Sequence, residues 1–315
     1  MKEKRGNMIF PIIDLHCDVL YKYENNILTS QSSLDLDASI ANLRAGHVKV
    51  QAYAIFVSSK LPKEAKRKSA LNQIYYFFKH VARPENHVVH ITAWSQITKL
   101  KDHEIGAFLT IEGVDFFQGD IKIWHIFRRF GVLNIGLTWN GSNEAADGIE
   151  EDLGRGITHF GKDIIRLNNE HQILTDVSHL SEKSFWHVLE HAKYIIASHS
   201  NAKALCSHRR NLTNEQILAM LQKKAQIHVV YYPTFISSEK VVYIKDLIKH
   251  IDHICSLGGK EFIGLGSDFD GIDSKVVNLE TAAQHQNLLN ELLKYYSEED
   301  VRGFAYQNFL NNCPK

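Results

Sequence analysis

The chain carries five short polar clusters whose residue types could bind metal ions, and each cluster follows a run of apolar residues. They are Asp14-Leu15-His16-Cys17-Asp18, Thr110-Ile111-Glu112-Gly113, Asp176-Val177-Ser178-His179, Ser198-His199-Ser200 and Gly266-Ser267-Asp268-Phe269-Asp270-Gly271. In the first cluster, His16 and Asp18 alternate along an extended segment, so both side chains share one face and could hold the same ion. Imidazole and carboxylate groups are ligands that divalent zinc accepts in proteins.

Each cluster alone also has an ordinary structural explanation. Glu112 could be a surface or helix-capping residue, and Asp268 could close an Asx turn. His179 and His199 could form hydrogen bonds within their own turns. If the clusters met in one place, however, so many unpaired carboxylates and imidazoles would destabilise the fold without a cation. The combination favours two divalent ions about 3.5–4 Å apart, which would generate a hydroxide near neutral pH and polarise a carbonyl group.

The sequence around these clusters predicts alternating strands and helices, which would position the clusters. Eight apolar, β-branched runs recur along the chain: 8–14, 48–57, 107–111, 132–137, 173–177, 194–197, 226–231 and 262–265. Several are apolar throughout, which is typical of parallel strands buried on both faces. Helical patterns lie between most of them, so we expect a (β/α)8 barrel, with a doubly wound sheet as the alternative. The clusters would then meet at the carboxyl ends of the barrel strands, where barrel enzymes carry their active sites.

Local signals place several helices between these strands. Ser181, Thr213 and Ser297 are predicted N-caps, and Asp37 is predicted to cap a helix that ends at Gly46. A stripe of Leu71, Ile74, Tyr75, Phe78 and Val81 predicts the buried face of another helix, and residues 240–257 read as a long helix closed by two glycines. The 315 residues show no composition break, so we expect a single metallohydrolase barrel domain over 1–315.

Composition excludes several classes of function. Lys plus Arg and Asp plus Glu both number 36, so no net charge would attract nucleic acid or anionic lipid. The four cysteines are scattered, which indicates reduced thiols rather than a disulfide framework. The apolar run near the N-terminus is short and lacks a cleavage site, and no run reaches the roughly 20 residues of a membrane span. We therefore expect a cytoplasmic protein without nucleic-acid or membrane partners.

The motifs in this order resemble the membrane (renal) dipeptidase family, peptidase family M19, whose members are zinc dipeptidases within the amidohydrolase-like barrels. The resemblance runs from about Ile13 to about Asp273. Besides the five clusters, it rests on Leu137-Thr138, on Cys206 with Arg209-Arg210-Asn211, and on Gly264-Leu265. The helical segment His250-Ile251-Asp252-His253 also resembles the family, and we expect it either to be structural or to contact the residues that hold the site.

The resemblance implies a role for each matching residue and a cofactor of two zinc ions. His16 and Asp18 would hold one ion, Glu112 would bridge both, and His179 and His199 would complete the second site. A further residue, Asp268, would manage protons at the attacking water and the leaving amine. Another, Arg210, would pair with the terminal carboxylate of a dipeptide substrate, a task that suits a guanidinium group. Formation of a homodimer is expected from the resemblance alone.

One position departs from the family pattern. Where the animal enzymes have a histidine after Leu-Thr, this chain has Trp139, whose indole can wall or stack in a pocket but donates only one hydrogen bond. The resemblance therefore implies a binuclear zinc dipeptidase that acts on dipeptides with a free carboxylate and uses a metal-bridging hydroxide as the nucleophile. Two alternatives stay open: a barrel metallohydrolase acting on another amide or ester, and a non-catalytic metal-binding protein.

Overall fold

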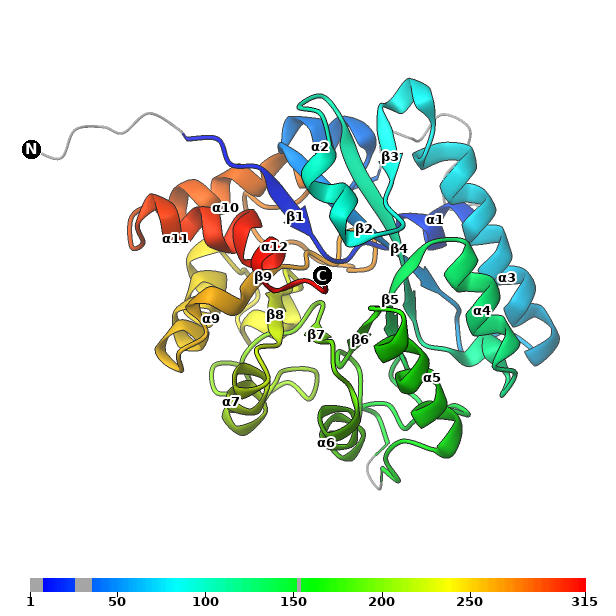
Figure 1. Ribbon diagram of the computed structural model, residues 1–315. Helices are drawn as coiled ribbons and strands as arrows, with labels where there is room; N and C mark the ends of the chain where they lie inside the picture. The colour runs from blue at the N-terminus through cyan, green and yellow to red at the C-terminus, as the bar shows by residue number, and fades with distance from the viewer. Residues whose placement is uncertain (1–7, 26–35, 152–153) are drawn as a thin grey trace, which may run out of the picture.

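The computed structural model describes residues 8–25, 36–151 and 154–315, and these residues form a barrel of parallel strands surrounded by helices (Figure 1). The barrel strands are β1 (Ile12–Asp14), β2 (Val48–Phe56), β4 (Ile105–Glu112), β5 (Val132–Gly136), β6 (Leu174–Asp176), β7 (Ile195–Ala197), β8 (Gln226–Val229) and β9 (Ile263–Leu265). Neighbours in this order pair with one another, β1 pairs with β9 as well as β2, and β2 pairs with β4. The predicted (β/α)8 barrel is confirmed, and each of its strands matches one predicted apolar run.

A further short strand, β3 (Val88–His90), was not predicted. It pairs with the first residues of β4, with Val88 opposite Ile105, whereas β5 pairs with β4 only from Leu109 onward. Because β3 has only three residues, its sequence shows no alternation that could distinguish it from a loop. It extends the sheet beside the N-terminal half of β4 and takes no part in closing the barrel.

The barrel strands are buried on both faces, which explains their apolar sequences. Along β4, Ala107 and Leu109 pack in the larger hydrophobic core, while Phe108 between them packs in a second cluster with residues of the other strands. Two residues from outside the barrel, Trp94 and Phe309, belong to this second cluster. Side chains therefore fill the barrel interior, as in other barrels of this type, and leave the carboxyl ends of the strands as the place for a pocket.

Helices cover the outside of the barrel (Figure 1). The longer ones are α3 (Lys63–Tyr76), α4 (Lys122–Arg129), α5 (His159–Glu170), α6 (Glu182–His191), α7 (Asn214–Gln222), α9 (Ile244–Ser256) and α10 (His285–Leu292). The three predicted N-caps are confirmed. The hydroxyls of Ser181, Thr213 and Ser297 each accept a hydrogen bond from the backbone N–H of the residue three positions later.

Two predicted helix starts were wrong. Helix α2 (Ile40–Ala45) is capped by Ser39, whose hydroxyl accepts a bond from the Asn42 N–H, and not by Asp37. The Asp37 carboxylate instead accepts the backbone N–H of Asp270, which is a long-range contact that no local pattern encodes. Helix α9 begins at Ile244 rather than Lys240, and its capping box places Asp246 against the backbone of Tyr243.

The predicted buried face of α3 was also wrong in part. Leu71, Tyr75 and Phe78 are 46%, 57% and 41% exposed, whereas the buried face includes Gln73 and Phe77. The Gln73 side chain is fully buried, and its hydrogen bonds with the backbone N–H and the carbonyl oxygen of Phe56, at the end of β2, compensate for the loss of water. The turn after α3 is a π-helix over Phe77–Val81, which rotates the chain relative to an α-helical pattern.

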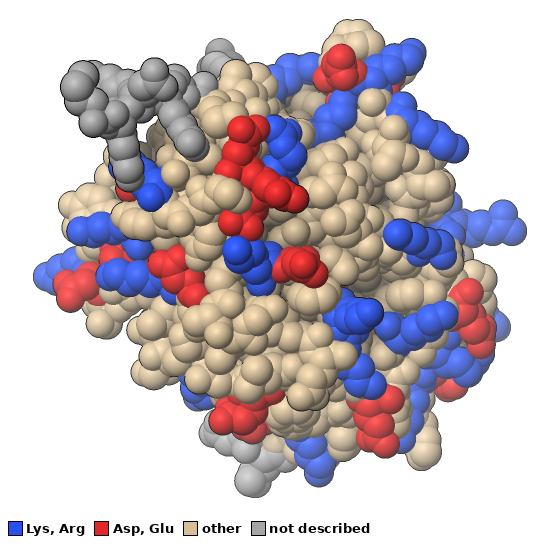
Figure 2. Space-filling model, turned by 60° about the vertical axis from the view of Figure 1, so that its left-hand side comes forward, with Lys and Arg blue, Asp and Glu red and all other residues tan. Residues whose placement is uncertain are grey.

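Charges of both signs are interspersed on the face shown in Figure 2, in keeping with the zero net charge. Within the described residues, none of the helices combines the length and apolar character needed to cross a membrane. The four cysteines are all free thiols.

Candidate active site

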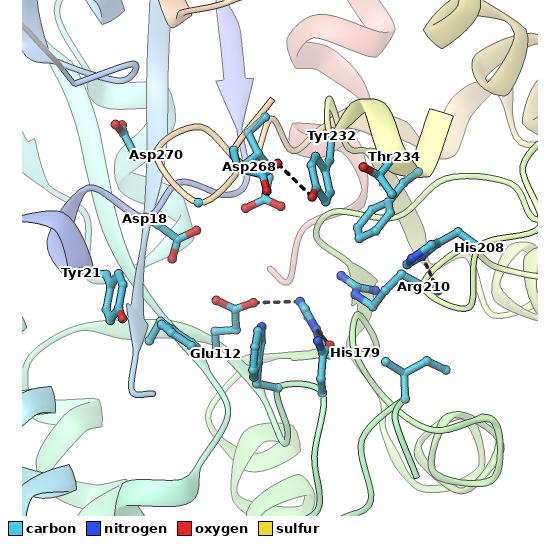
Figure 3. Close-up of a pocket in the computed structure, with 18 of the residues that line it drawn as sticks. Asp18, Tyr21, Glu112, His179, His208, Arg210, Tyr232, Thr234, Asp268 and Asp270 are labelled. Atoms are coloured by element: carbon cyan, nitrogen blue, oxygen red, sulfur yellow. Dashed lines mark hydrogen bonds and ion pairs between the residues drawn. The ribbon is translucent and has the colours of Figure 1, made fainter. Parts of the chain in front are cut away.

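The five polar clusters come together at the carboxyl ends of the barrel strands, and four of them contribute residues to the lining of one pocket. The pocket has a volume of about 720 Å³, which is large enough for a small organic ligand. The predicted residues Asp18, Glu112, His179, Arg210 and Asp268 all line it (Figure 3). Trp139 also forms part of its wall. The remaining two, His16 and His199, lie directly beneath, in ring contact with each other at 3.9 Å between centroids.

Glu112 lies at the centre of this arrangement. Its Oε2 is 3.6 Å from His16 Nε2, while its Oε1 is 2.8 Å from His179 Nε2 and 3.7 Å from His199 Nε2. The two carboxylate oxygens therefore face two different groups of side chains. This is the arrangement that a carboxylate bridging two ions requires.

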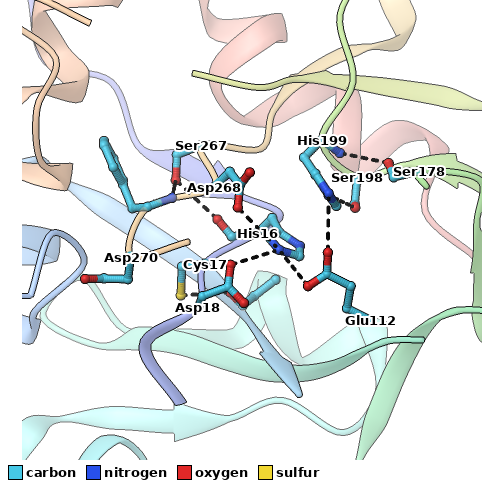
Figure 4. Close-up of polar contacts among 12 residues, drawn as sticks. His16, Cys17, Asp18, Glu112, Ser178, Ser198, His199, Ser267, Asp268 and Asp270 are labelled. Carbon is cyan, nitrogen blue, oxygen red and sulfur yellow. Dashed lines mark hydrogen bonds and ion pairs between the residues drawn. The ribbon is translucent and has the colours of Figure 1, made fainter. Parts of the chain in front are cut away.

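The first group gathers around His16 (Figure 4). Its Nε2 lies 3.4 Å from Asp18 Oδ2 and 3.7 Å from Asp268 Oδ1. Both His16 Nε2 and Asp18 Oδ1 are buried without a hydrogen-bond partner. A buried imidazole nitrogen and carboxylate oxygen without partners are costly, unless a cation binds them.

The second group contains the two remaining histidines. His179 Nε2 and His199 Nε2 lie 2.8 Å apart, so both nitrogens point into the same space. The opposite nitrogen of each ring is occupied: His179 Nδ1 contacts Asn140 Oδ1 at 2.6 Å, and His199 Nδ1 contacts the Ser198 hydroxyl at 2.7 Å. A neutral imidazole that donates from Nδ1 presents the lone pair of Nε2, and this pattern is common at zinc sites. The donor set therefore fits two divalent ions with Glu112 between them.

The electrostatics of the isolated side chains agree with this fit. Burial raises the pKa of Asp268 well above its usual range, and Asp18 and Glu112 raise it further, although His16 opposes them. Burial also raises the pKa of Asp18. Three carboxylates thus face one another with little water to screen them, and a cation bound among them would favour the charged form of each.

The histidines respond to the same surroundings in opposite ways. Burial lowers the pKa of His179 to about 4 and that of His199 well below its usual range, so both rings stay neutral near pH 7. Burial opposes the charged form of His16 as well, but Glu112 and Asp18 outweigh it and raise the His16 pKa. Neutral imidazoles are the form that binds metals.

Two buried carboxylates position the turns that carry these side chains. Asp176 Oδ1 accepts the backbone N–H groups of Ser178 and Ser198, each at 3.0 Å, and so fixes the turns after β6 and β7. Asp14 accepts both the backbone N–H and the hydroxyl of Ser267, at 2.8 and 2.6 Å, and thereby joins β1 to the turn after β9. These hydrogen bonds hold His179, His199 and Asp268 in place.

Arg210 is a buried cation on one side of the pocket. Its side chain is 5% exposed, its guanidinium lies 5.5 Å from the centre of the Phe235 ring, and its Nη2 donates to the carbonyl oxygen of His199 at 3.4 Å. Nε is buried without a partner, and within the described parts of the chain no carboxylate forms an ion pair with Arg210. Burial lowers its pKa to about 10, so the group remains charged at neutral pH. An unpaired buried guanidinium is suited to bind an anion.

The comparison with known families is consistent with this geometry. The sequence model of the membrane dipeptidase family, peptidase family M19, matches residues 4–313. The chain belongs to this family. It is therefore an enzyme, a metallopeptidase of the dipeptidase class, and the resemblance inferred from its motifs is confirmed.

Several known proteins resemble the chain in sequence or in fold. An uncharacterized dipeptidase of Schizosaccharomyces pombe (strain 972 / ATCC 24843) is 29% identical over 307 residues, which covers 90% of this chain and 75% of that protein. An uncharacterized Klebsiella pneumoniae protein encoded in the pqqA 5′ region is 33% identical over 190 residues, covering 56% and 70%. The fold matches a Rhodobacter sphaeroides metallopeptidase liganded with a phosphinate mimic of the dipeptide L-Ala-D-Ala, with a TM-score of 0.89, 19% identity and coverage of 97% and 100%.

Three residues contribute to this site without having been assigned a role: Asn140 lines the pocket, and Asp14 and Asp176 lie in two of the polar clusters. Asn140 contacts His179, and Asp14 and Asp176 position the turns, yet none of the three was predicted as a site residue. Asn140 directly follows Trp139 at the start of a long loop, which is a weak signal. The His250 ring accepts the Ala202 N–H and contacts the Ile236 carbonyl oxygen, and His250 does not line the pocket.

Proposed function

We propose that the chain is a binuclear zinc dipeptidase that hydrolyses dipeptides with a free C-terminal carboxylate. His16 and Asp18 would hold one ion, His179 and His199 the other, and Glu112 would bridge them. Two such ions would supply Lewis acidity toward a carbonyl group and would activate water as a nucleophile at neutral pH. The observation that carries the proposal is the position of Glu112, whose two oxygens face two separate groups of buried, partly unpaired donors.

The other side chains of the pocket bind the substrate and move its protons. Arg210 binds the terminal carboxylate, because it is a buried cation of the pocket that has no ion pair within the described parts of the chain. Asp268 lies within 3.7 Å of His16 and takes the proton of the attacking water before donating it to the leaving amine. Trp139 lies edge-on to Phe56, with ring centroids 5.2 Å apart, and 6.2 Å from the His179 ring, so it forms a wall beside the scissile bond.

The metal content of purified protein tests the first part of this proposal. We expect about two zinc equivalents per chain in the wild type by plasma mass spectrometry. Glu112→Ala should lower the occupancy of both sites, since Glu112 contacts both groups of donors. The matched control is Glu170→Ala, which removes an exposed carboxylate on α5 and should leave the zinc content unchanged. Full zinc content together with full activity in Glu112→Ala would refute the assignment.

Gly271 provides a second test, because it lies against the predicted ligands. A Cβ atom at this position would lie 2.1 Å from Asp18 Oδ2 and 2.7 Å from Asp268 Oδ1. Gly271→Ala should therefore displace both carboxylates and weaken zinc affinity by about 10- to 100-fold, the usual effect of disturbing the groups that orient metal ligands. A competition titration with a chelator measures this. Gly141→Ala is the control, since a Cβ there would meet nothing within 4 Å.

A different amide or ester substrate is the second candidate, and the presence of Trp139 favours it. The family histidine at this position would offer a charged or neutral donor, whereas the indole offers one N–H group. A dipeptide library assayed for released amino acids distinguishes the two candidates. Hydrolysis of dipeptides supports the proposed function, and zinc-loaded protein that cleaves none of them would contradict it.

A further inference from the structure

Three aromatic side chains that contact one another line the pocket. Tyr21 on α1 (Val19–Glu24), Phe56 at the end of β2 and Trp139 after β5 form a continuous row, with ring centroids 5.0 Å apart for the first pair and 5.2 Å for the second. Figure 3 shows Tyr21 and Arg210 on opposite sides of Glu112 and His179. All three rings are only partly buried and line the pocket, so they offer apolar surface to a ligand.

Hydrogen bonds from α3 hold the end of β2, which carries Phe56, and the end of α1, the helix that carries Tyr21. Gln73, which is fully buried on α3, accepts the backbone N–H of Phe56 at 3.0 Å and donates to the carbonyl oxygen of the same residue. Gln73 Nε2 also lies 2.9 Å from the carboxylate of Glu24, and the Ser69 hydroxyl donates to that carboxylate at 2.7 Å. The ends of α1 and β2 are thereby joined to α3. This polar network fixes the backbone that carries Phe56 and the end of α1 before a ligand arrives, which reduces the entropy lost on binding.

The charges beside the row favour an uncharged ligand group. Lys22 is the nearby cation on α1, but its ammonium group is bound to Asp270 Oδ1 at 2.8 Å. Asp18 and Asp270 both line this side of the pocket. Among the described residues on this side of the pocket no cation is free to pair with an acidic side chain, and burial of an unpaired carboxylate is unfavourable.

We propose that Tyr21, Phe56 and Trp139 form the subsite for the side chain of the N-terminal residue of the substrate, and that they select dipeptides with a large apolar N-terminal residue. The inference rests on the proposed function. With the C-terminal carboxylate at Arg210 and the scissile bond beside Glu112, the N-terminal residue extends toward the aromatic row. Burial of an aromatic side chain against three rings should raise kcat/KM by about 10- to 100-fold over a methyl group.

The experiment compares kcat/KM for four dipeptides: Phe-Ala, Ala-Phe, Ala-Ala and Glu-Ala. For the zinc-loaded wild type we expect Phe-Ala to exceed Ala-Ala by about 10- to 100-fold, Ala-Phe to show a smaller gain, and Glu-Ala to be the poorest substrate. Equal rates for Phe-Ala and Ala-Ala, or a larger gain for Ala-Phe than for Phe-Ala, would overturn the subsite and leave the dipeptidase function intact. Failure to cleave any of the four would contradict the proposed function itself, and the subsite with it.

Variants then assign the preference to the aromatic row. Phe56→Ala and Tyr21→Ala should each lower the ratio of Phe-Ala to Ala-Ala at least about threefold, while the ratio of Ala-Phe to Ala-Ala stays the same. The matched control is Tyr75→Ala, which removes an exposed aromatic ring of α3 outside the pocket and should change neither ratio. Because ratios are compared, a partial loss of folded enzyme does not affect the result. An unchanged Phe-Ala preference in both pocket variants would overturn the proposal.

Discussion

Asp268→Asn should reduce kcat for dipeptide hydrolysis by about 10²- to 10⁴-fold, with zinc content near the wild-type value and KM little changed. The substitution keeps the shape of the side chain but removes the basic oxygen that would accept a proton. Asp268 has a positive φ of 63°, and asparagine tolerates this left-handed conformation as well as aspartate does. The backbone is therefore not strained by the change. Steady-state kinetics and metal analysis on the same preparation measure the effect.

A purely structural role for Asp268 predicts a different result. If the carboxylate served only to close an Asx turn, asparagine would replace it and kcat would stay nearly normal. The structure gives this turn other hydrogen bonds: the Ser267 hydroxyl accepts the Phe269 N–H, and the Asp268 N–H donates to the His16 carbonyl oxygen. Among the residues that the structure describes, no backbone N–H donates to the Asp268 carboxylate. Asp163→Asn on the exposed face of α5 is the control for purification and metal loading. Near-normal kcat in a fully zinc-loaded Asp268→Asn enzyme would show that another group transfers the proton.

The barrel and the main site could be predicted from the sequence because both depend on local and positional signals. Strands buried on two faces read as apolar runs, and the residues just after them must gather at one end of the barrel. His16, Glu112 and Asp268 are therefore identifiable from their place after a run. Strand β3 lacks such a signal, because three residues are too few to show a pattern.

The parts that could not be predicted depend on long-range polar contacts. Gln73 is polar and yet fully buried, since its partners lie on β2 and α1, and its burial excludes Leu71 and Tyr75 from the packed face of α3. In the same way, Asp37 bonds the backbone of Asp270 instead of capping the helix beside it. A periodicity argument assigns polar residues to the surface or to caps, so it fails wherever a buried hydrogen bond compensates for burial.

Arg210→Ala should lower kcat/KM for dipeptides by about 30- to 5,000-fold, mainly through KM. This range corresponds to the roughly 2–5 kcal/mol lost when one partner of a buried charge pair is removed. A dipeptide amide lacks the carboxylate, so it should be a poor substrate for the wild type for the same reason. We would measure kcat/KM for a dipeptide and for its amide with the wild type and with Arg210→Ala. The wild type should prefer the dipeptide over the amide, and this preference should largely disappear in the variant.

Thermal stability distinguishes this binding role from a structural one. In the free protein the described residues provide no ion pair for the buried charge of Arg210, and burial opposes this charge and lowers the pKa of Arg210 to about 10. Removal of such a group should not lower the melting temperature, although a residue that held the fold together would lower it when removed. Arg210→Lys keeps the charge but loses the planar fork that binds both carboxylate oxygens, so it should restore only part of the affinity. A variant that melts earlier yet still discriminates acid from amide would make Arg210 a structural residue, and another group would then have to bind the carboxylate.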